Sequence, residues 1–135
     1  MISIDSVWQQ YFDNNHEGLG TTYERFILHR YFERLKSTYQ IKNVLEAPSF
    51  GMTGISGINS MWWATNGARV TVVDDNKERI ALIEDIWREV SIEANFIYNS
   101  NSFTSLPFTD KLFDMGWNFA ALWFVPDLES FLNEM

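Results

Sequence analysis

The fold of this chain is decided by residues 41–75, IKNVLEAPSFGMTGISGINSMWWATNGARVTVVDD. A short apolar strand ends in an acid, Glu46, and a loop with several glycines follows it. The pattern then predicts a helix over residues 55–65 and a strand over residues 69–73 that ends in a second acid, Asp74. The second strand is apolar and β-branched, which suits a strand buried on both faces of a parallel sheet.

The rest of the chain repeats this alternation of strand and helix. The further elements that the apolar spacing predicts are helices over residues 5–15 and 21–39, a helix capped by Asp75 or Asn76, strands over residues 95–98 and 113–118, and a helix from about Asp127. We expect N-terminal helices at residues 1–40 and a strand-and-helix domain at residues 41–135. Because strands that alternate with helices form right-handed crossovers, the predicted fold class is α/β, doubly wound, with a mainly parallel sheet. A ligand is then expected beyond the carboxyl ends of the strands.

The overall composition excludes several classes of binding partner and of reactive site. A net charge of −8 over 135 residues disfavours nucleic acid and anionic membranes as partners. The absence of cysteine excludes disulfides, thiolate nucleophiles and cysteine-bound zinc, and two histidines without ligand spacing predict no metal site. No apolar run approaches the roughly 18 residues of a membrane helix, and the start lacks a signal-peptide pattern. A cytoplasmic protein is therefore expected.

The loop after the first strand is the first candidate ligand site. Its glycines, Gly51, Gly54 and Gly57, are spaced three residues apart. Glycine lets the backbone approach a ligand closely, but it equally serves a tight turn between a strand and a helix, and the spacing fits both uses. The dinucleotide fingerprint G-x-G-x-x-G and the phosphate-binding G-K-[ST] are both absent.

The two strand-ending acids are the second candidate. Asp74 follows Gly54 by 20 residues, the separation at which an acid accepts hydrogen bonds from ribose hydroxyls. The alternative is that Asp74 only caps the next helix, and we favour the ribose role because Asp75 and Asn76 can supply the cap. Glu46 stands where dinucleotide enzymes usually have no acid, which suits a cationic ligand group better than a pyrophosphate.

Taken together, Glu46, Gly51 and Asp74 resemble the cofactor site of the class I S-adenosylmethionine-dependent methyltransferases, a family with a Rossmann-like fold. The segments that carry the resemblance are VLEA at 44–47, GARVTVVD at 67–74, SLPFTDKLFD at 105–114 and NFAALW at 118–123. The resemblance covers roughly residues 40–135, and it implies S-adenosylmethionine as the cofactor.

The resemblance also implies a role for each matching residue. Glu46 is implied near the methionine amino group, Gly51 along the methionine part, and Asp74 at the ribose. Three further cofactor residues are implied: Ser102 at the position that meets the adenine amino group, Phe103 beside the adenine ring, and Asn118 near the methionine carboxylate or the substrate. No catalytic side chain is predicted, because methyl transfer mainly requires that donor and acceptor are positioned.

The implied function is a methyltransferase acting on an unknown small-molecule acceptor. The alternative is a non-catalytic Rossmann-like module, cofactor-binding or scaffolding, whose sheet is completed by a partner chain. In the family's strand order, 3-2-1-4, a chain shortened after strand four leaves an open apolar edge, so we expect a homo-oligomer through that edge.

The sequence also gives predictions for His29 and for the N-terminal helices. His29 is predicted to be a partly exposed residue on a helix face, rather than a general base. The N-terminal helices either form a lid over the pocket, with Tyr23 as the residue of interest, or pack in the ordinary way against the sheet.

Overall fold

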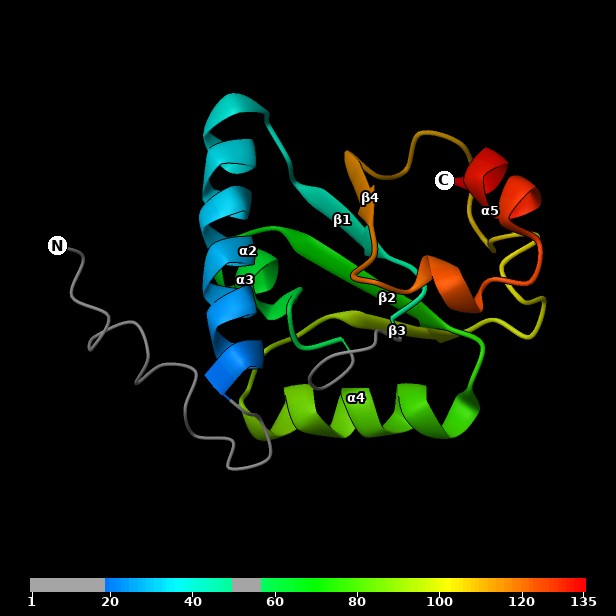
Figure 1. Cartoon of the computed structure of the whole chain (residues 1–135), viewed down its shortest axis with the longest axis horizontal. Coiled ribbons are helices and arrows are strands. Elements are labelled where there is room, and N and C mark those ends of the chain that lie inside the picture. The colour runs from blue at the N-terminus through cyan, green and yellow to red at the C-terminus, as the bar shows by residue number, and fades with distance from the viewer. Residues whose placement is uncertain (1–18, 50–56) are drawn as a thin grey trace, which may run out of the picture.

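The structure is a computed structural model that describes residues 19–49 and 57–135 (Figure 1). At its centre lies a parallel sheet of four strands in the order β3-β2-β1-β4. The strands are β1 (Asn43–Glu46), β2 (Arg69–Asp74), β3 (Asn95–Tyr98) and β4 (Met115–Trp117). This topology confirms the predicted order 3-2-1-4 and the α/β, Rossmann-like fold class.

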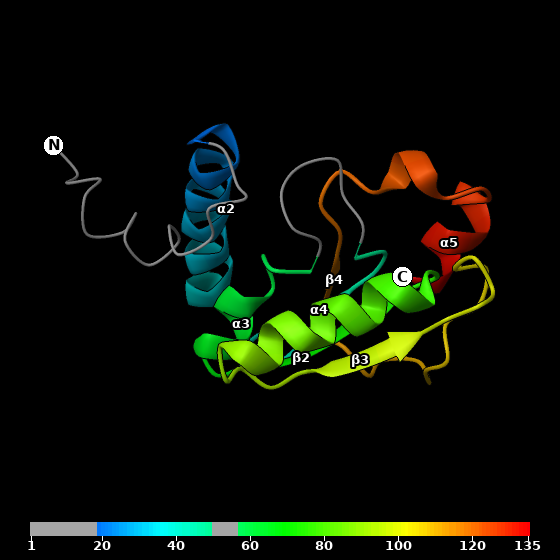
Figure 2. The ribbon, with the colours of Figure 1, turned by 90° about the horizontal axis from the view of Figure 1, so that it is seen from below.

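The helices lie around this sheet. They are α2 (Leu19–Thr38), α3 (Met61–Thr65), α4 (Lys77–Glu89), the 3-10 helix η1 (Leu122–Phe124) and α5 (Leu128–Glu134). Figure 2 shows α4 running along β2 and β3, with which it makes most of its contacts. The side chain of Asn76 accepts a hydrogen bond from the Arg79 backbone N–H at 2.9 Å, so Asn76 is the cap of α4 and leaves Asp74 available for another role.

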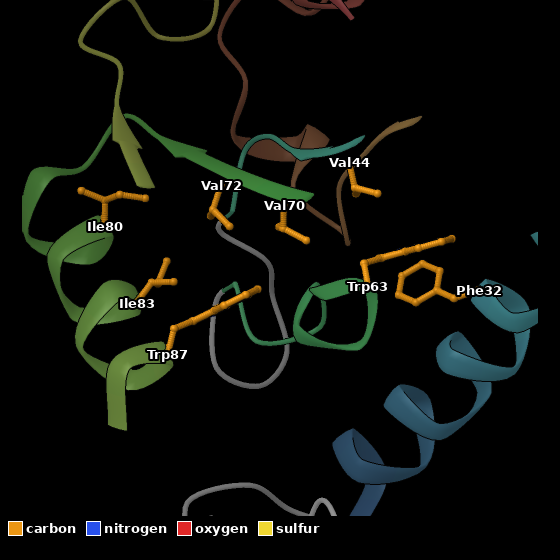
Figure 3. Packing of buried hydrophobic residues seen from close by; sticks show 8 residues of the cluster. All are labelled: Phe32, Val44, Trp63, Val70, Val72, Ile80, Ile83 and Trp87. Atoms are coloured by element: carbon orange, nitrogen blue, oxygen red, sulfur yellow. The ribbon is translucent and has the colours of Figure 1, made fainter. Parts of the chain in front are cut away.

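One face of the sheet is covered by α2, α3 and α4. The alternation of side chains along each strand sends Val44, Val70 and Val72 to this face. The buried aromatic and aliphatic side chains that meet them are Phe32, Trp63, Ile80, Ile83 and Trp87 (Figure 3). The rings of Phe32 and Trp63 lie 5.0 Å apart, so α2 is anchored to the sheet through α3.

The opposite face is covered mostly by irregular chain. Leu45 and Val73 point to this side, where the segment after β3 and the end of the chain supply the partners Phe103, Leu106, Val125 and Phe131. Residues 99–114, which join β3 to β4, contain no helix. The helices of the two crossovers, α3 and α4, therefore lie on one face of the sheet, and α5 lies on the other face.

The start of the sheet is fixed by Asp114, which belongs to the segment resembling the methyltransferases. Its carboxylate accepts hydrogen bonds from the backbone N–H groups of Lys42 (2.9 Å) and Asn43 (2.8 Å). These two donors hold the pKa of the Asp114 carboxyl below its ordinary value. The acid thereby joins the amino ends of β1 and β4.

The helix predicted over residues 55–65 is wrong in its extent. Among residues 57–65, the part of this range that the structure describes, only Met61–Thr65 is α-helical, and residues 57–60 form a turn. The turn depends on Gly57, which has a φ of +72° and whose carbonyl accepts a hydrogen bond from the Trp87 indole N–H at 3.1 Å. A helical periodicity in the sequence does not reveal that contact with α4, which forms only in the folded chain.

Two other predictions concern the N-terminal helices. The helix predicted over residues 5–15 lies outside the described residues. The second helix exists as α2, and its buried face is formed by Arg25, His29 and Phe32, whereas Tyr31 is exposed. Among residues 19–49 and 57–135, no helix is long and apolar enough to cross a membrane.

Candidate functional site

Two buried acids lie side by side at the carboxyl edge of the sheet. Glu46 ends β1 and is 2% exposed, while Asp74 ends the neighbouring strand β2 and is fully buried. In the register of the two strands, Glu46 is level with Val72, so Asp74 extends two residues further. Charged side chains are seldom fully buried unless they are paired or serve a ligand, so this pair is the candidate site.

Within the part of the chain that the structure describes, three hydrogen-bond donors hold Asp74. One carboxylate oxygen accepts from the Asn76 backbone N–H at 2.9 Å and from Arg79 Nε at 3.0 Å. The other oxygen accepts from the hydroxyl of Ser49, in the loop that follows β1. The Arg79 contact is a salt bridge, and Arg79 also lies 3.8 Å from the carboxylate of Asp75. Asp74 is thus surrounded by groups that stabilise its negative charge.

Glu46 has a different environment. The Ser60 side chain donates a hydrogen bond to its carboxyl group, but Oε2 is buried and has no partner among the residues that the structure describes. Burial raises the pKa of the Glu46 carboxyl to about 8, the Ser60 hydrogen bond opposes this rise, and the charge of Asp74 adds to it. An acid with a buried oxygen of this kind suits a hydrogen-bond donor supplied by a ligand.

A polar layer connects Glu46 to α2 and β4. The Trp117 indole N–H donates to Ser60 Oγ at 3.1 Å, and Arg25 Nε donates to the side chain of Asn59 at 3.1 Å. Arg25 and His29 are both buried in this layer. Three distant parts of the chain (α2, the turn at 57–60 and β4) therefore position the hydroxyl that holds Glu46.

The prediction for His29 was wrong about its exposure. The imidazole is 7% exposed and lies 6.0 Å from the ring of Phe32 and 6.1 Å from that of Trp62. Burial and the neighbouring charge of Arg25 lower its pKa to about 3, although a hydrogen bond with the Asn59 backbone acts in the opposite direction. His29 is therefore a neutral packing residue at physiological pH. His29 follows Arg25 by four residues and precedes Phe32 by three, and these three residues form the buried face of α2.

The loop after β3 reaches the site through backbone contacts. The Asn99 N–H donates to the Asp74 carbonyl at 2.8 Å, and the Asn99 side chain holds the loop by donating to the Ser105 carbonyl at 2.9 Å. Ser102 and Phe103 have positive φ values of 45° and 63°, so the chain turns sharply there. The Phe103 ring is 2% exposed and packs against Phe131, so a ligand at this turn meets mainly the backbone of Phe103.

The remaining predicted site residues lie on either side of this edge. Asn118 follows β4 directly and is half-buried, and the carbonyl of its neighbour Trp117 accepts a hydrogen bond from Ala47 N–H at 3.1 Å. The structure thus places Asn118 beside the loop that leaves β1. Gly51 and Gly54 lie outside the described residues.

Sequence reasoning missed four residues of this site: Ser49, Ser60, Arg79 and Arg25. Arg79 lies in the first turn of α4 and reaches back to Asp74. A local signal existed, because an arginine five residues after a strand-ending acid and close to the helix cap is within reach of that acid. No comparable signal existed for Ser60 or Arg25, whose roles depend on contacts between distant segments.

A comparison with known protein families identifies the family of this chain. A family model described as a methyltransferase domain matches residues 51–135, which is well over half of the chain. The chain belongs to the class I S-adenosylmethionine-dependent methyltransferases. None of the curated proteins matches it.

This methyltransferase domain carries Asp74, the turn at Ser102 and Phe103, and Asn118 within the matched span, while Glu46 precedes it. Domains of this family generally bind S-adenosylmethionine. Glu46 fits such a ligand in particular: its Oε2 is buried, has no partner within residues 19–49 and 57–135, and can accept a hydrogen bond from an ammonium group. A carboxylate accepts about four hydrogen bonds, and the described residues supply three of them to Asp74, which leaves capacity for about one further donor.

The exposed face of α2 carries a groove that neither Glu46 nor Asp74 lines. Tyr23 is 54% exposed and lines a shallow, mostly apolar groove with Ile27, Tyr31 and Phe119. Phe119 is the neighbour of Asn118, so the groove reaches the loop after β4. The role of Tyr23 as part of a lid stays a prediction.

Proposed function

We propose that this chain binds S-adenosylmethionine at the carboxyl edge of its sheet and transfers the methyl group to a small-molecule acceptor. The observation that supports the proposal is the pair of buried acids, Glu46 and Asp74, at neighbouring strand ends in a domain of the methyltransferase family. One acid has a buried oxygen without a partner in the described part of the chain, and the other lies where the family's fold places a ribose.

In this proposal Asp74 binds the ribose and Glu46 binds the amino group of the methionine part. A ribose offers two hydroxyl donors, whereas Asp74 has room for about one more. Arg79 is the donor that can turn away, because its side chain is 24% exposed and Asp75 is close enough to receive it. Ser49 cannot be displaced in the same way, because it is buried and its hydroxyl would be left without a hydrogen bond to Asp74.

The protein's contribution to the chemistry is placement. When bound, S-adenosylmethionine supplies an electrophilic methyl group on a sulfonium, which an acceptor nucleophile takes with loss of a proton. No group of three or more histidine, aspartate or glutamate side chains suited to a metal occurs within the described residues. Glu46, Asp74 and the loops after β3 and β4 would hold the cofactor so that one face of the methyl group is open to the acceptor. Asn118 follows β4 on this edge and would orient the acceptor or the methionine carboxylate.

Calorimetric titration with S-adenosylhomocysteine tests the proposal directly. The parent chain is expected to bind, and Asp74→Asn is expected to weaken the affinity at least about tenfold, because one lost hydrogen bond to a charged group costs roughly 1.5–3 kcal/mol. The matched control is Asp85→Asn, an exposed acid on α4 whose ion pair with Arg88 lies away from the site.

Two outcomes would overturn this assignment. A folded parent chain that gives no binding heat at high ligand concentration contradicts the cofactor proposal as a whole. Binding that is equally strong in the parent, in Asp74→Asn and in Asp85→Asn places the ribose elsewhere. Thermal unfolding of each variant, measured beside the titration, shows that the folded state was present.

A further inference from the structure

The two acids of the site hold different numbers of hydrogen-bond donors, and this difference has a consequence for their protons. Asp74 has a backbone N–H, a hydroxyl and a guanidinium within hydrogen-bond distance. Glu46 has one hydroxyl, from Ser60, and a second oxygen that is buried without a partner in the described chain. When two buried acids are neighbours, the one with the poorer set of donors is the one that keeps its proton.

The charged groups around Glu46 reinforce this division. On β2, the ionised Asp74 repels a second negative charge, and Arg79 of α4 is engaged with Asp74 and Asp75. On α2, Arg25 contacts Asn59, and His29 is neutral because burial keeps its pKa near 3. Trp117 of β4 carries no charge and donates to Ser60. Residues 50–56, which follow β1, contain no ionisable side chain.

We propose that Glu46 is a proton-coupled receptor for the ammonium end of the cofactor, so that binding expels one proton from the protein. This inference rests on the proposed function of the site. In the free protein the group is a carboxylic acid. When an ammonium group enters, the O–H bond of Glu46 breaks, the proton passes to solvent, and the carboxylate pairs with the ammonium. The charges balance: the buried site gains one positive charge with the ligand and loses one proton.

The coupling predicts a specific pH dependence of affinity. Burial raises the pKa of the Glu46 carboxyl to about 8, so below that pH the proton must be removed before the ion pair can form. The affinity should therefore rise about tenfold for each pH unit between pH ~5.5 and ~7, where one proton is exchanged per ligand. The ammonium group of the ligand stays protonated throughout this range, so its own titration does not contribute.

The first measurement needs no ligand. Infrared difference spectroscopy between the parent chain and Glu46→Gln at pH ~6.5 is expected to show the C=O stretch of a protonated, buried carboxyl group in the parent. A parent chain whose difference spectrum shows only carboxylate bands overturns the inference, whatever the protein binds.

The second measurement counts the proton. Titration of the whole chain with S-adenosylhomocysteine is carried out in two buffers that differ in ionisation enthalpy. The parent is expected to release close to one proton per ligand at pH ~6.5, while Glu46→Gln releases none and its affinity is flat from pH ~5.5 to ~7. The control is Glu89→Gln, an exposed glutamate at the end of α4, which is expected to behave like the parent.

The outcomes separate this inference from the proposed function. Binding by the parent without proton release, or proton release that persists in Glu46→Gln, overturns the role of Glu46 and leaves cofactor binding in place. Absence of binding by the folded parent and by Glu89→Gln at every pH overturns the proposed function, and the coupling with it.

Discussion

At the scale of single residues, the burial of Glu46 makes the free energy of unfolding depend on pH. Its pKa rises from 4.5 to about 8 on folding, so the folded state keeps a proton that the unfolded state gives up. A raised pKa contributes stability that is fully present below pH ~4.5 and is lost as the pH rises to ~8. Asp74, in contrast, accepts hydrogen bonds from three donors among the described residues.

Glu46→Gln should therefore stabilise the ligand-free protein at neutral pH. The side chain keeps its shape but has no proton to lose, so the difference in unfolding free energy between variant and parent should grow with pH by up to about 1.4 kcal/mol per unit between pH ~4.5 and ~8. Urea unfolding across this range measures the difference. Comparing the variant with the parent is essential, because the lowered pKa of His29 acts with the opposite sign below pH ~6.5. A difference that stays constant with pH would contradict the buried-proton account.

At the scale of elements, the turn before α3 shows how one glycine shapes the site. The turn contains Gly57 and carries Asn59 and Ser60, which contact Arg25 and Glu46. A Cβ atom at Gly57 would lie 2.7 Å from Cγ2 of Ile83, in addition to the strain of a positive φ. The position therefore depends on glycine twice, once for its backbone and once for the close approach of α4.

Gly57→Ala is expected to destabilise the protein by about 2–4 kcal/mol, the sum of backbone strain and overpacking. The control is Gly67→Ala, where φ is +89° but nothing lies within 4 Å of the new Cβ, so only the strain of about 1–2 kcal/mol remains. Urea unfolding of both variants compares them. Equal losses at the two glycines would show that the contact with Ile83 does not matter.

At the scale of the whole molecule, β4 has a neighbouring strand on one side only among the described strands. The Trp117 carbonyl accepts a hydrogen bond from the N–H of Ala47, the residue after β1, so the alternation of the backbone directs the N–H and C=O of Gly116 to the outer side. Gly116 is exposed, and the side chains of Met115 and Trp117 beside it are half-buried. An unpaired edge of this kind is a template for another strand.

We propose that two copies of this chain associate through the outer edge of β4. Sedimentation equilibrium should then show a reversible increase of mass toward a dimer as the concentration rises. Gly116→Pro removes the outward N–H and should shift the molecule to the monomer, with circular dichroism confirming that the fold is retained. A parent chain that stays monomeric at high concentration would exclude the association.

The elements that depend on local chemistry agree closely with the predictions made from the sequence. The strands at residues 69–74 and 95–98, the cap at Asn76 and the acids at the ends of β1 and β2 were predicted closely. These features depend on local chemistry: β-branched runs favour strands, a side-chain oxygen caps a helix, and an acid at a strand end stays at that end. The turn at residues 57–60 was missed because Gly57 is fixed by a contact with Trp87, 30 residues away.

By itself, the sequence determined the parallel α/β fold class and the places of Glu46 and Asp74, since both follow from patterns a few residues long. Tertiary structure alone decided that Arg79 and Ser49 hold Asp74, that His29 is buried, and that burial raises the pKa of the Glu46 carboxyl. The physical reason is that burial and pairing depend on which distant segments pack together. The charge state of a carboxyl group follows from its surroundings, and those surroundings exist only once α2, the turn before α3 and β4 have come together.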